Sequence, residues 1–341
     1  MRTAVIIVNW NSWEDTARCI EAVLKLNGYA GAIFVCDNGS TDGSREKLIG
    51  WAEGSIRVEA DSDAPEIKSL TTPVAPRPLV ILAGDEATLS RMVQQDGASD
   101  RAIYLLRSEI NLGFAGGNNI ALRTALTDTR FELFWLLNAD AVPAKEALAE
   151  LQACYIDETQ PMLVGSVILE YSDPCIIQAR GARFNKWLLT SHHRDEGKPT
   201  SLLAKLPRMQ YTDYPIGASL VMNKSFLLEQ GLLEERLFLY FEEIDLARRL
   251  TSDRVLVCNK SLVYHKGGAS TNTGIDFEIR SDFADRCMIY SRVVFASKLG
   301  FSLLCLSLIV SFYSILKRVV LGKFRRAANG LTSVILAISD K

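Results

Sequence analysis

Three carboxylates lie within four positions of residues 237–250, LFLYFEEIDLARRL, directly after an apolar run and ahead of two arginines. A carboxylate within hydrogen-bond reach of a proton can act as a general base. Helical spacing places Glu242, Asp245 and Arg249 on one face, and Glu243 points about 100° away from them. The alternative is an ordinary helix start, with acids at the positive end of the helix dipole and Asp245 paired with Arg249.

A second group of polar candidates follows the apolar run of FWLLNADAVP, residues 134–143. Asn138 and Asp140 place two oxygen-bearing side chains two positions apart at the expected end of a strand. Mg²⁺ and similar cations prefer oxygen ligands and bind well beside phosphates, so this position suits a metal–diphosphate site. A strand-end turn without a ligand is the alternative. His265 follows another aliphatic run and is either a metal ligand or a buried core histidine.

Two further turns combine polar side chains with glycines. CDNGSTDGS, residues 36–44, can line a ligand cleft with a carboxylate and backbone amides, or it is a polar turn only. NLGFAGGNNIAL, residues 111–122, brings Gly113, Gly116 and Gly117 to the start of a helical pattern, which permits close approach of a ligand to the backbone.

Short aliphatic runs alternate with helical patterns in the first half of the chain. The runs are AVIIV, AIFVCD and FELFWLLNAD, and the helical patterns are WEDTARCIEAVLKL and DGSREKLIGWAE. Strand–helix–strand order predicts an α/β fold with a mainly parallel, Rossmann-like sheet covered by helices on both faces. Ligands of such sheets bind beyond the carboxyl ends of the strands, which selects residues 9–11, 37–42 and 138–140.

The middle and the end of the chain differ in character from the alternating part. Residues 60–78 are rich in Pro, Ser, Thr and Asp and predict a surface loop, while residues 79–97 either add a strand and a helix or extend that loop. We therefore treat residues 60–100 as a loop or insertion within a catalytic domain formed by residues 1–290. Residues 291–341 are predicted to form a hydrophobic and basic helical segment that associates with a membrane.

That C-terminal segment contains 17 uncharged residues, Gly300 to Leu316, which span about 25 Å as a helix against a hydrocarbon core of roughly 30 Å. The basic residues that follow suit anionic headgroups: Lys317, Arg318, Lys323, Arg325 and Arg326. We expect a membrane contact that either spans or only docks. A buried core helix with a solvated basic end is the alternative.

Composition restricts the partners and the compartment. The formal net charge of −2 gives no overall basic field, so nucleic acid is not an expected partner. Seven scattered cysteines without a C-x-x-C spacing fit free thiols in a reducing compartment. The four-residue aliphatic run near the start is too short for a signal sequence, and we expect a cytoplasmic location.

Taken in this order, the stretches resemble glycosyltransferase family 2, the inverting sugar-nucleotide-dependent transferases of the GT-A fold, and particularly its rhamnosyltransferase-like members. The resemblance covers residues 4–271. The matching stretches are VIIVNWNSWEDTARCIEAVL, VCDNGSTDGS, NLGFAGGNN, WLLNADAVP, PIGASLVMNKSFLLEQGLLEERLFLYFEEIDLARRL and VYHKGGAST.

The resemblance implies roles for individual residues at the nucleotide and metal sites. Asp140 corresponds to the last acid of the family's D-x-D-like metal motif, Asn138 replaces its first acid, and His265 completes the shell of Mg²⁺ or Mn²⁺. The implied contacts to the nucleotide or its sugar are Asn9, Asn11, Asp37, Asn38, Gly113, Gly117, Asn118 and Asn138.

The resemblance also implies the catalytic residues. The family's motif has the form E-D-x-D followed by Arg, and EEIDLARR aligns with it. Glu243 therefore takes the place of the base, with Glu instead of Asp, and Asp245 is the alternative base, with Arg249 beside it. The aromatic run ahead of Glu243 becomes a cleft wall, and Gly217 to Ser219 line the acceptor cleft or are small for packing.

The implied reaction transfers a sugar, rhamnose or a similar one, from a dTDP, UDP or GDP donor to a hydroxyl of a glycan or lipid-linked glycan. Such an enzyme serves cell-surface polysaccharide synthesis at the cytoplasmic membrane, where it meets an anionic surface. Two alternatives stay open: a catalytically degenerate, carbohydrate-binding relative and a sugar nucleotidyltransferase. The chain lacks the Gly-rich, basic N-terminal signature expected of the latter.

Overall fold

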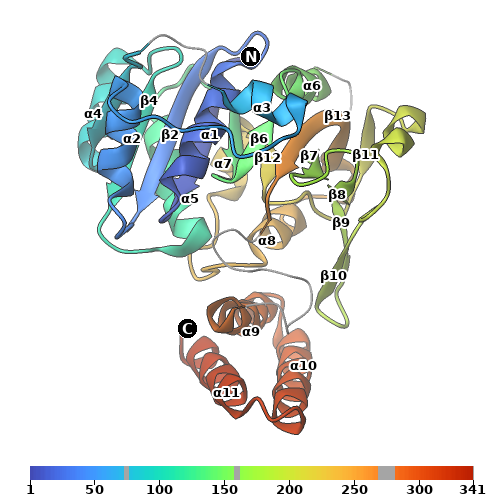
Figure 1. The fold of residues 1–341 in the computed structure, drawn as a ribbon. Coiled ribbons are helices and arrows are strands. Elements are labelled where there is room, and N and C mark those ends of the chain that lie inside the picture. Colours follow the sequence, from blue (N-terminus) through green and yellow to red (C-terminus); the bar gives the residue numbers. More distant parts are fainter. Residues whose placement is uncertain (73–76, 157–161, 268–280, 341) are drawn as a thin grey trace.

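The computed structural model describes residues 1–72, 77–156, 162–267 and 281–340. Its centre is a mixed β-sheet with helices on both faces, as Figure 1 shows. The strands of this sheet are β1 (Thr3–Asn9), β2 (Gly31–Asn38), β3 (Ile81–Gly84), β4 (Ile103–Ser108), β5 (Leu133–Leu137), β6 (Ala141–Pro143), β7 (Leu163–Glu170), β8 (Ile177–Ala179), β11 (Met209–Tyr211), β12 (Ser219–Asn223) and β13 (Val255–His265). A separate hairpin pairs β9 (Ala182–Asn185) with β10 (Thr190–His193).

The helices follow the strands in the alternating order expected for the first half of the chain. They are α1 (Trp13–Leu24), α2 (Ser44–Glu53), α3 (Pro65–Thr71), α4 (Glu86–Asp96), α5 (Gly113–Leu126), α6 (Ala147–Cys154), α7 (Lys224–Gln230), α8 (Glu242–Arg248), α9 (Asp282–Lys298), α10 (Phe301–Val320) and α11 (Phe324–Ser339). Two short 3₁₀ turns cover Thr200–Lys205 and Ser252–Arg254.

The sheet has the strand order β11-β13-β7-β12-β5-β1-β2-β4-β3. Strands β3, β4, β2, β1 and β5 are parallel, so their carboxyl ends meet at one edge. Strand β12 runs antiparallel to both β5 and β7 and joins the second half of the sheet to the first. The predicted α/β fold with helices on both faces of the sheet is confirmed, with a parallel first half and a mixed second half.

Alternation along the buried strands supplies two cores, one on each face of the sheet. Ile6 and Phe34 pack into the cluster beneath α4 and α5, while their neighbours Ile7 and Val35 pack with Ile20 of α1. Because successive strand residues point to opposite faces, a run that is apolar throughout requires helices on both sides.

Residues 60–100 are more regular than predicted. The expected loop at residues 60–78 contains helix α3, which begins at Pro65 and buries Ile67 and Leu70. Proline suits the first turn of a helix because its missing N–H has no helical partner there. Residues 79–97 add strand β3 and helix α4, the first of the two alternatives. Residues 73–76 of the predicted loop lie outside the described part of the chain.

Helices α9, α10 and α11 pack on one another beyond α8 and the β9–β10 hairpin, at one end of the molecule (Figure 1). Among the described residues, α10 is the helix that is long and apolar enough to cross a membrane. The predicted domain boundary between residues 290 and 291 falls inside α9. Phe295 of α9 packs against Phe241, with ring centroids 5.2 Å apart, so this helix also contacts the segment before α8.

Candidate active site

A cleft of about 290 Å³ opens at the carboxyl ends of the parallel strands, the edge that strand topology selects for ligands. It receives side chains from the ends of β1, β2, β5 and β13, from the start of α5 and α8, and from α9. The lining residues are Val8, Trp10, Ser12, Asn38, Asn111, Gly113, Phe114, Asn138, Ala139, Asp140, Ile216, Gly217, Ala218, Phe238, Leu239, Tyr240, Glu242, Glu243, His265 and Phe283.

The segment ahead of α8 reaches the cleft through an unusual backbone. Tyr240 and Phe241 have φ angles of 74° and 71°, a left-handed conformation that side chains other than glycine rarely adopt. Such residues cost about 1 kcal/mol or more and persist where surrounding contacts hold them. Here the ring of Phe241 packs against Phe184 and Phe295. The two residues turn the chain so that α8 begins with its acids at the cleft.

Glu243, the predicted base, lines the cleft beside Gly217. A Cβ on Gly217 would lie 3.6 Å from Oε1 of Glu243, so glycine leaves room around the carboxylate. Burial raises the pKa of Glu243, although the backbone N–H groups of Glu243 and Gly217 donate to the carboxylate and oppose that rise. A raised pKa makes the ionised carboxylate a stronger base.

Glu242 also lines the cleft, although the helix-start interpretation accounted for it fully. Its side chain is buried, and Oε1 has no hydrogen-bond partner among the described residues. Burial and the neighbouring charge of Glu243 raise the pKa of Glu242 well above its ordinary value. The adjacent pair thus favours a proton on Glu242 and a charge on Glu243.

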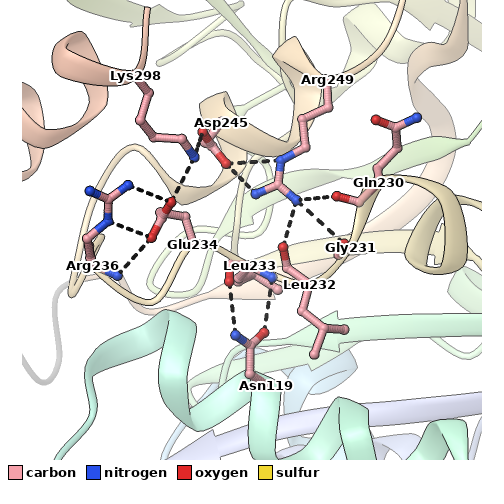
Figure 2. Close-up of polar contacts among 10 residues, drawn as sticks. All are labelled: Asn119, Gln230, Gly231, Leu232, Leu233, Glu234, Arg236, Asp245, Arg249 and Lys298. Carbon is pink, nitrogen blue, oxygen red and sulfur yellow. Dashed lines mark hydrogen bonds and ion pairs between the residues drawn. The ribbon is translucent and has the colours of Figure 1, made fainter. Parts of the chain in front are cut away.

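Asp245, the alternative base, lies outside the cleft lining and is buried between two cations (Figure 2). Its Oδ1 accepts a hydrogen bond from Nζ of Lys298 at 2.6 Å, and its Oδ2 accepts one from Nε of Arg249 at 3.1 Å. The same lysine lies 3.1 Å from Glu234, which also binds Arg236. A carboxylate held in this way orders α8 and is not placed to meet a substrate.

Arg249 extends this network to the loop ahead of the acidic motif. Its Nη1 donates to the carbonyl oxygens of Gln230 and Leu232 at 3.0 and 2.6 Å (Figure 2). Asn119 of α5 pairs with the backbone of Leu233, donating to its carbonyl at 2.9 Å and accepting from its N–H at 3.0 Å. The last Asn of NLGFAGGNN therefore ties α5 to the acidic motif, a contact that the sequence did not predict.

Asp140 and His265, the predicted metal ligands, lie side by side at the ends of β5 and β13. Nε2 of His265 is 3.2 Å from Oδ1 of Asp140 and 3.3 Å from Nδ2 of Asn138. Burial is the largest single influence on Asp140 and raises its pKa, but the charge and hydrogen bond of His265, a backbone hydrogen bond and the charge of Lys266 together lower the pKa overall. Burial is the largest single influence on His265 and lowers its pKa, but the charge and hydrogen bond of Asp140 and the charge of Glu170 together raise the pKa overall.

Gln178 of β8 fixes the orientation of this histidine. Its Nε2 donates to Glu170 and to the carbonyl oxygen of His265, so its Oε1 faces Nδ1 of the imidazole at 2.8 Å and accepts. Nδ1 therefore carries the hydrogen, which leaves Nε2 to face Asp140. A lone pair facing a carboxylate repels it, so a proton or a cation belongs between the two atoms.

The donor set fits a divalent cation that a diphosphate also holds. Asp140 and His265 supply a carboxylate and an imidazole, and the amide of Asn138 can turn its oxygen inward. Within the described residues, His, Cys, Asp and Glu form no cluster of three or more that could hold a metal without further ligands. Phosphate oxygens commonly complete such a shell for Mg²⁺.

The predicted nucleoside contacts near β1 and β2 mostly bind one another. Nδ2 of the buried Asn9 donates to Asp37 at 2.8 Å, and neither residue lines the cleft. Nδ2 of Asn9 also lies 3.1 Å from Oγ of Ser40, which accepts from the N–H of Asn11 at 2.9 Å. Asn9 and Asp37 thus hold the turn that contains Asn11, at the margin of the cleft.

The predicted glycine-rich contacts divide into cleft residues and packing residues. Asn38 and Gly113 line the cleft, and Nδ2 of Asn38 donates to the carbonyl oxygen of Gly113 at 2.9 Å. A Cβ on Gly117 would lie 2.8 Å from Val8, so this glycine permits α5 to pack on β1. Asn118 is buried, and its Nδ2 donates to the carbonyl oxygen of Phe114 at 2.8 Å within α5.

Several cleft residues were not predicted individually. Phe238, Leu239 and Tyr240 form the expected aromatic wall ahead of Glu243. Phe283 of α9 continues this wall, with its ring centroid 5.6 Å from that of Phe238. Sequence offered no signal for Phe283, because its contact depends on how α9 docks. Trp10, which follows the end of β1, was open to prediction from the strand-end rule.

Comparisons with known proteins agree with this geometry. Residues 4–60 match the family model of glycosyl transferase family 2. The low-salt glycan biosynthesis hexosyltransferase Agl10 of Haloferax volcanii is 20% identical over 244 residues, which cover 70% of this chain and 76% of that protein.

Two solved structures resemble the fold at low sequence identity. GalNAc-T7 with UDP, GalNAc and Mn²⁺ has a TM-score of 0.52 at 15% identity over 86% of this chain, which spans 50% of the length of that structure. The mannosyltransferase PcManGT of Pyrobaculum calidifontis, in complex with GDP-Man and Mn²⁺, has a TM-score of 0.51 at 12% identity, covering 100% of this chain and 88% of that one.

These matches define the class of protein. The solved structures show the GT-A fold, and the family model and the hexosyltransferase relative support assignment to glycosyltransferase family 2. The chain is a glycosyltransferase enzyme.

Proposed function

We propose that this enzyme is an inverting hexosyltransferase that moves a sugar from a nucleoside-diphosphate donor to a hydroxyl of a glycan or lipid-linked glycan. The observation that carries the proposal is one cleft with two kinds of site. Glu243 lines one part of its wall, and the Asp140–His265 pair lines another. Inverting transfer needs a base for the acceptor and neutralisation of the leaving diphosphate.

Glu243 is proposed to take the proton of the acceptor hydroxyl as that oxygen attacks the anomeric carbon. The N–H of Gly217 donates to the carboxylate and orients it, and burial raises its pKa and thus its basicity. The position of Glu243 is supported indirectly by the ion pairs of Asp245 with Arg249 and Lys298, because these pairs hold α8 in place. In this proposal Asp245 and Arg249 are positioning residues.

Asp140, His265 and the amide oxygen of Asn138 are proposed to hold Mg²⁺ or Mn²⁺. When bound, the cation supplies positive charge against the diphosphate as the bond to the sugar breaks. Two structures of similar fold, those of GalNAc-T7 and PcManGT, contain Mn²⁺ together with UDP or GDP-Man, which supports the proposal.

The nucleotide is proposed to lie across the carboxyl ends of β1 and β2. The proposed contacts are Asn38 and Gly113, which line the cleft, and Asn11 at its margin, while Asn9 and Asp37 hold the turn beneath. Gly117 and Asn118 act by shaping α5, whose first residues face the cleft. The positive end of this helix suits the negative charge of a diphosphate.

The donor sugar is proposed to be rhamnose or another hexose, carried by dTDP, UDP or GDP. The name of the Haloferax relative, a hexosyltransferase of glycan biosynthesis, supports a hexose and a role in surface glycans. We also infer that the enzyme works at the cytoplasmic face of the membrane, supported by the apolar length of α10.

Donor binding tests the proposal directly. We expect one nucleotide sugar among dTDP-rhamnose, UDP-sugars and GDP-sugars to raise the melting temperature in the presence of Mg²⁺ or Mn²⁺, and to be hydrolysed slowly without acceptor. Asp140→Ala should remove the part of the nucleotide affinity that depends on the cation. Equal affinity of the wild-type enzyme with and without cation would contradict the metal site, and no binding of any donor would contradict the function.

A further inference from the structure

Helices α10 and α11 expose more large apolar side chains than a water-soluble helix pair does. The fully buried side chains are mostly small or polar, and many of the large apolar ones are exposed, while Leu303, Leu304, Leu308 and Ile315 are half-buried and pack inward. The buried residues are Ser307, Ser311, Arg318, Ala327, Gly330, Ser333, Val334 and Ala337. A surface helix in water normally buries its apolar stripe and exposes its polar face.

The outward face of α10 is a continuous apolar stripe. Ile309, Tyr313, Leu316 and Val320 follow helical spacing on one side, and each is between 60 and 77% exposed. On α11, Leu331, Ile335 and Ile338 repeat the pattern and are also exposed. Single exposed apolar residues are common, but two aligned stripes on neighbouring helices mark a contact surface. We call these seven residues the outer apolar face.

Charge along this part of the chain identifies the partner. Residues 281–339 carry eight basic and two acidic side chains, a net charge of +6 in a chain of net charge −2, so the remainder carries −8. Residues 301–339 contain five basic side chains and no acidic one. A basic apolar surface is attracted to anionic lipid headgroups. A second copy would bring the same positive charges against each other.

Helix α9 decides between docking on the bilayer and spanning it. Asp285 of α9 pairs with the buried Arg318 of α10 through Nε at 2.9 Å, and Asp282 pairs with Arg326 at 2.6 Å. The same helix packs on the acidic-motif segment through Phe295 and donates from Ser291 to the carbonyl oxygen of Leu239 at 2.8 Å. Helix α10 is thus held along a charged helix that belongs to the catalytic unit, and lipid cannot surround it.

We propose that the outer apolar face docks into the headgroup region of an anionic lipid bilayer, with α10 and α11 lying in its surface and not crossing it. This surface specifies the membrane location given under the proposed function. Lipid binding itself does not require the proposed reaction; only the route of the acceptor to Glu243 does. Phe283 of α9 lines the cleft, so docking brings this wall of the cleft toward the lipid. An acceptor with a lipid anchor would reach Glu243 from that side.

Vesicle binding by the full-length protein tests the surface without any sugar donor. We expect sedimentation with phosphatidylcholine vesicles that contain phosphatidylglycerol, much less with phosphatidylcholine alone, and release by high salt. The pair Ile309→Gln and Leu316→Gln should lower the bound-to-free ratio by on the order of tenfold or more. Arg325→Gln should lower it by about fivefold.

A matched control separates this surface from general apolar exposure. Val80 and Leu228 are 60 and 69% exposed outside α10 and α11, so Val80→Gln with Leu228→Gln should leave vesicle binding unchanged. Both pairs should keep the wild-type melting temperature and rate of donor hydrolysis. If the wild-type protein binds vesicles but hydrolyses no donor, the proposed function is rejected and the docking proposal is unaffected.

Three outcomes would overturn the docking proposal. If the Ile309→Gln and Leu316→Gln variant binds vesicles as well as the wild-type protein does, the outer apolar face is not the lipid-binding surface. If the wild-type protein forms a dimer and does not bind vesicles, and the variant is a monomer, the partner of this face is a second copy of the chain. Bound wild-type protein should transfer to a second vesicle population when the two are mixed. Failure to transfer would indicate that α10 spans the bilayer and does not dock on it.

Discussion

Glu242 and Glu243 are neighbours in the chain, yet their surroundings give them different states. Glu243 has an N–H donor from Gly217, which favours its charged form, whereas Oε1 of Glu242 is buried and finds no hydrogen-bond partner in the described part of the chain. Two adjacent carboxylates in a cleft rarely both ionise, because each charge raises the pKa of the other. At the residue scale, a shared proton on Glu242 leaves Glu243 available as the base.

Replacing Glu243 by Gln should lower the transfer rate by roughly 10²- to 10⁴-fold, because the amide cannot take the acceptor's proton. Nucleotide affinity, measured by calorimetry, should stay within about twofold, since the proposed nucleotide contacts lie elsewhere in the cleft. Glu242→Gln is the matched control and should keep most activity. The assignment fails if the Glu243 variant transfers at the wild-type rate, or if only the Glu242 variant is inactive.

Stability should depend on pH through Glu242. Its pKa is raised in the folded protein, so as pH rises above the ordinary Glu pKa of about 4.3 the unfolded chain releases a proton that the folded chain keeps. Folded stability is therefore lost as pH rises through this window. Glu242→Gln removes the effect and should raise the melting temperature by roughly 2–4 °C at pH 8, but not at pH 4. An equal change at both pH values would contradict a buried, proton-bearing Glu242.

Helix α8 has seven residues, too few to be stable alone, and at the element scale its position depends on its neighbours. Lys298 of α9 and Arg249 fix Asp245 from two sides, while Asn119 of α5 holds Leu233 in the preceding loop. Aromatic packing from Phe295 of α9 holds Phe241, the second of the two residues with positive φ. The proposed base, Glu243, thus depends on α9 and α5 for its position more than on its own helix.

Lys298→Met should weaken this support. Removing one cation leaves the buried Asp245 with Arg249 alone, which should lower the free energy of unfolding by roughly 1.5–3 kcal/mol in a denaturant titration. Transfer should slow by up to about 10²-fold, because a small displacement of a catalytic group is costly. Lys260→Met, at an exposed lysine of β13, is the control. If stability falls but activity is unchanged, the position of Glu243 in the cleft does not depend on the Lys298–Asp245 ion pair.

At the scale of the whole molecule, α9 connects the candidate active site with α10 and α11, which carry the proposed lipid surface. Phe283 lines the cleft, and Phe295 and Lys298 hold the segment that presents Glu243. The outer apolar face lies on α10 and α11, which extend away from the sheet (Figure 1). Truncation inside α9 would therefore affect both sugar transfer and lipid binding.

Removal of residues 293–341 should abolish donor hydrolysis in a lipid-free assay and lower the melting temperature, because it deletes Phe295 and Lys298 from the support of α8. The Ile309→Gln and Leu316→Gln variant should keep hydrolysis under the same conditions. Wild-type hydrolysis by the truncated chain would show that α9 does not position the base.

Much of the fold and part of the site followed from the sequence, because both depend on local patterns. Alternating apolar runs predicted β1, α1, β2 and α2, and the strand-end rule placed Asn138 and Asp140 at the cleft. Residues 65–71 were mistaken for a loop, since a short helix with polar composition gains its stability from burying Ile67 and Leu70. The uncharged run in α10 was visible, whereas its outward orientation was not.

The sequence by itself determined which residues carry carboxylates, amides and glycines at strand ends and helix starts, because period and composition act within a few positions. Only the tertiary structure decided their tasks. It put Asp245 between Lys298 and Arg249, and it left Oε1 of Glu242 without a hydrogen-bond partner among the described residues. It also fixed His265 through Gln178 and brought Phe283 to the cleft. Burial, pKa and ion pairing depend on residues far apart in the chain, and those distances are set by packing.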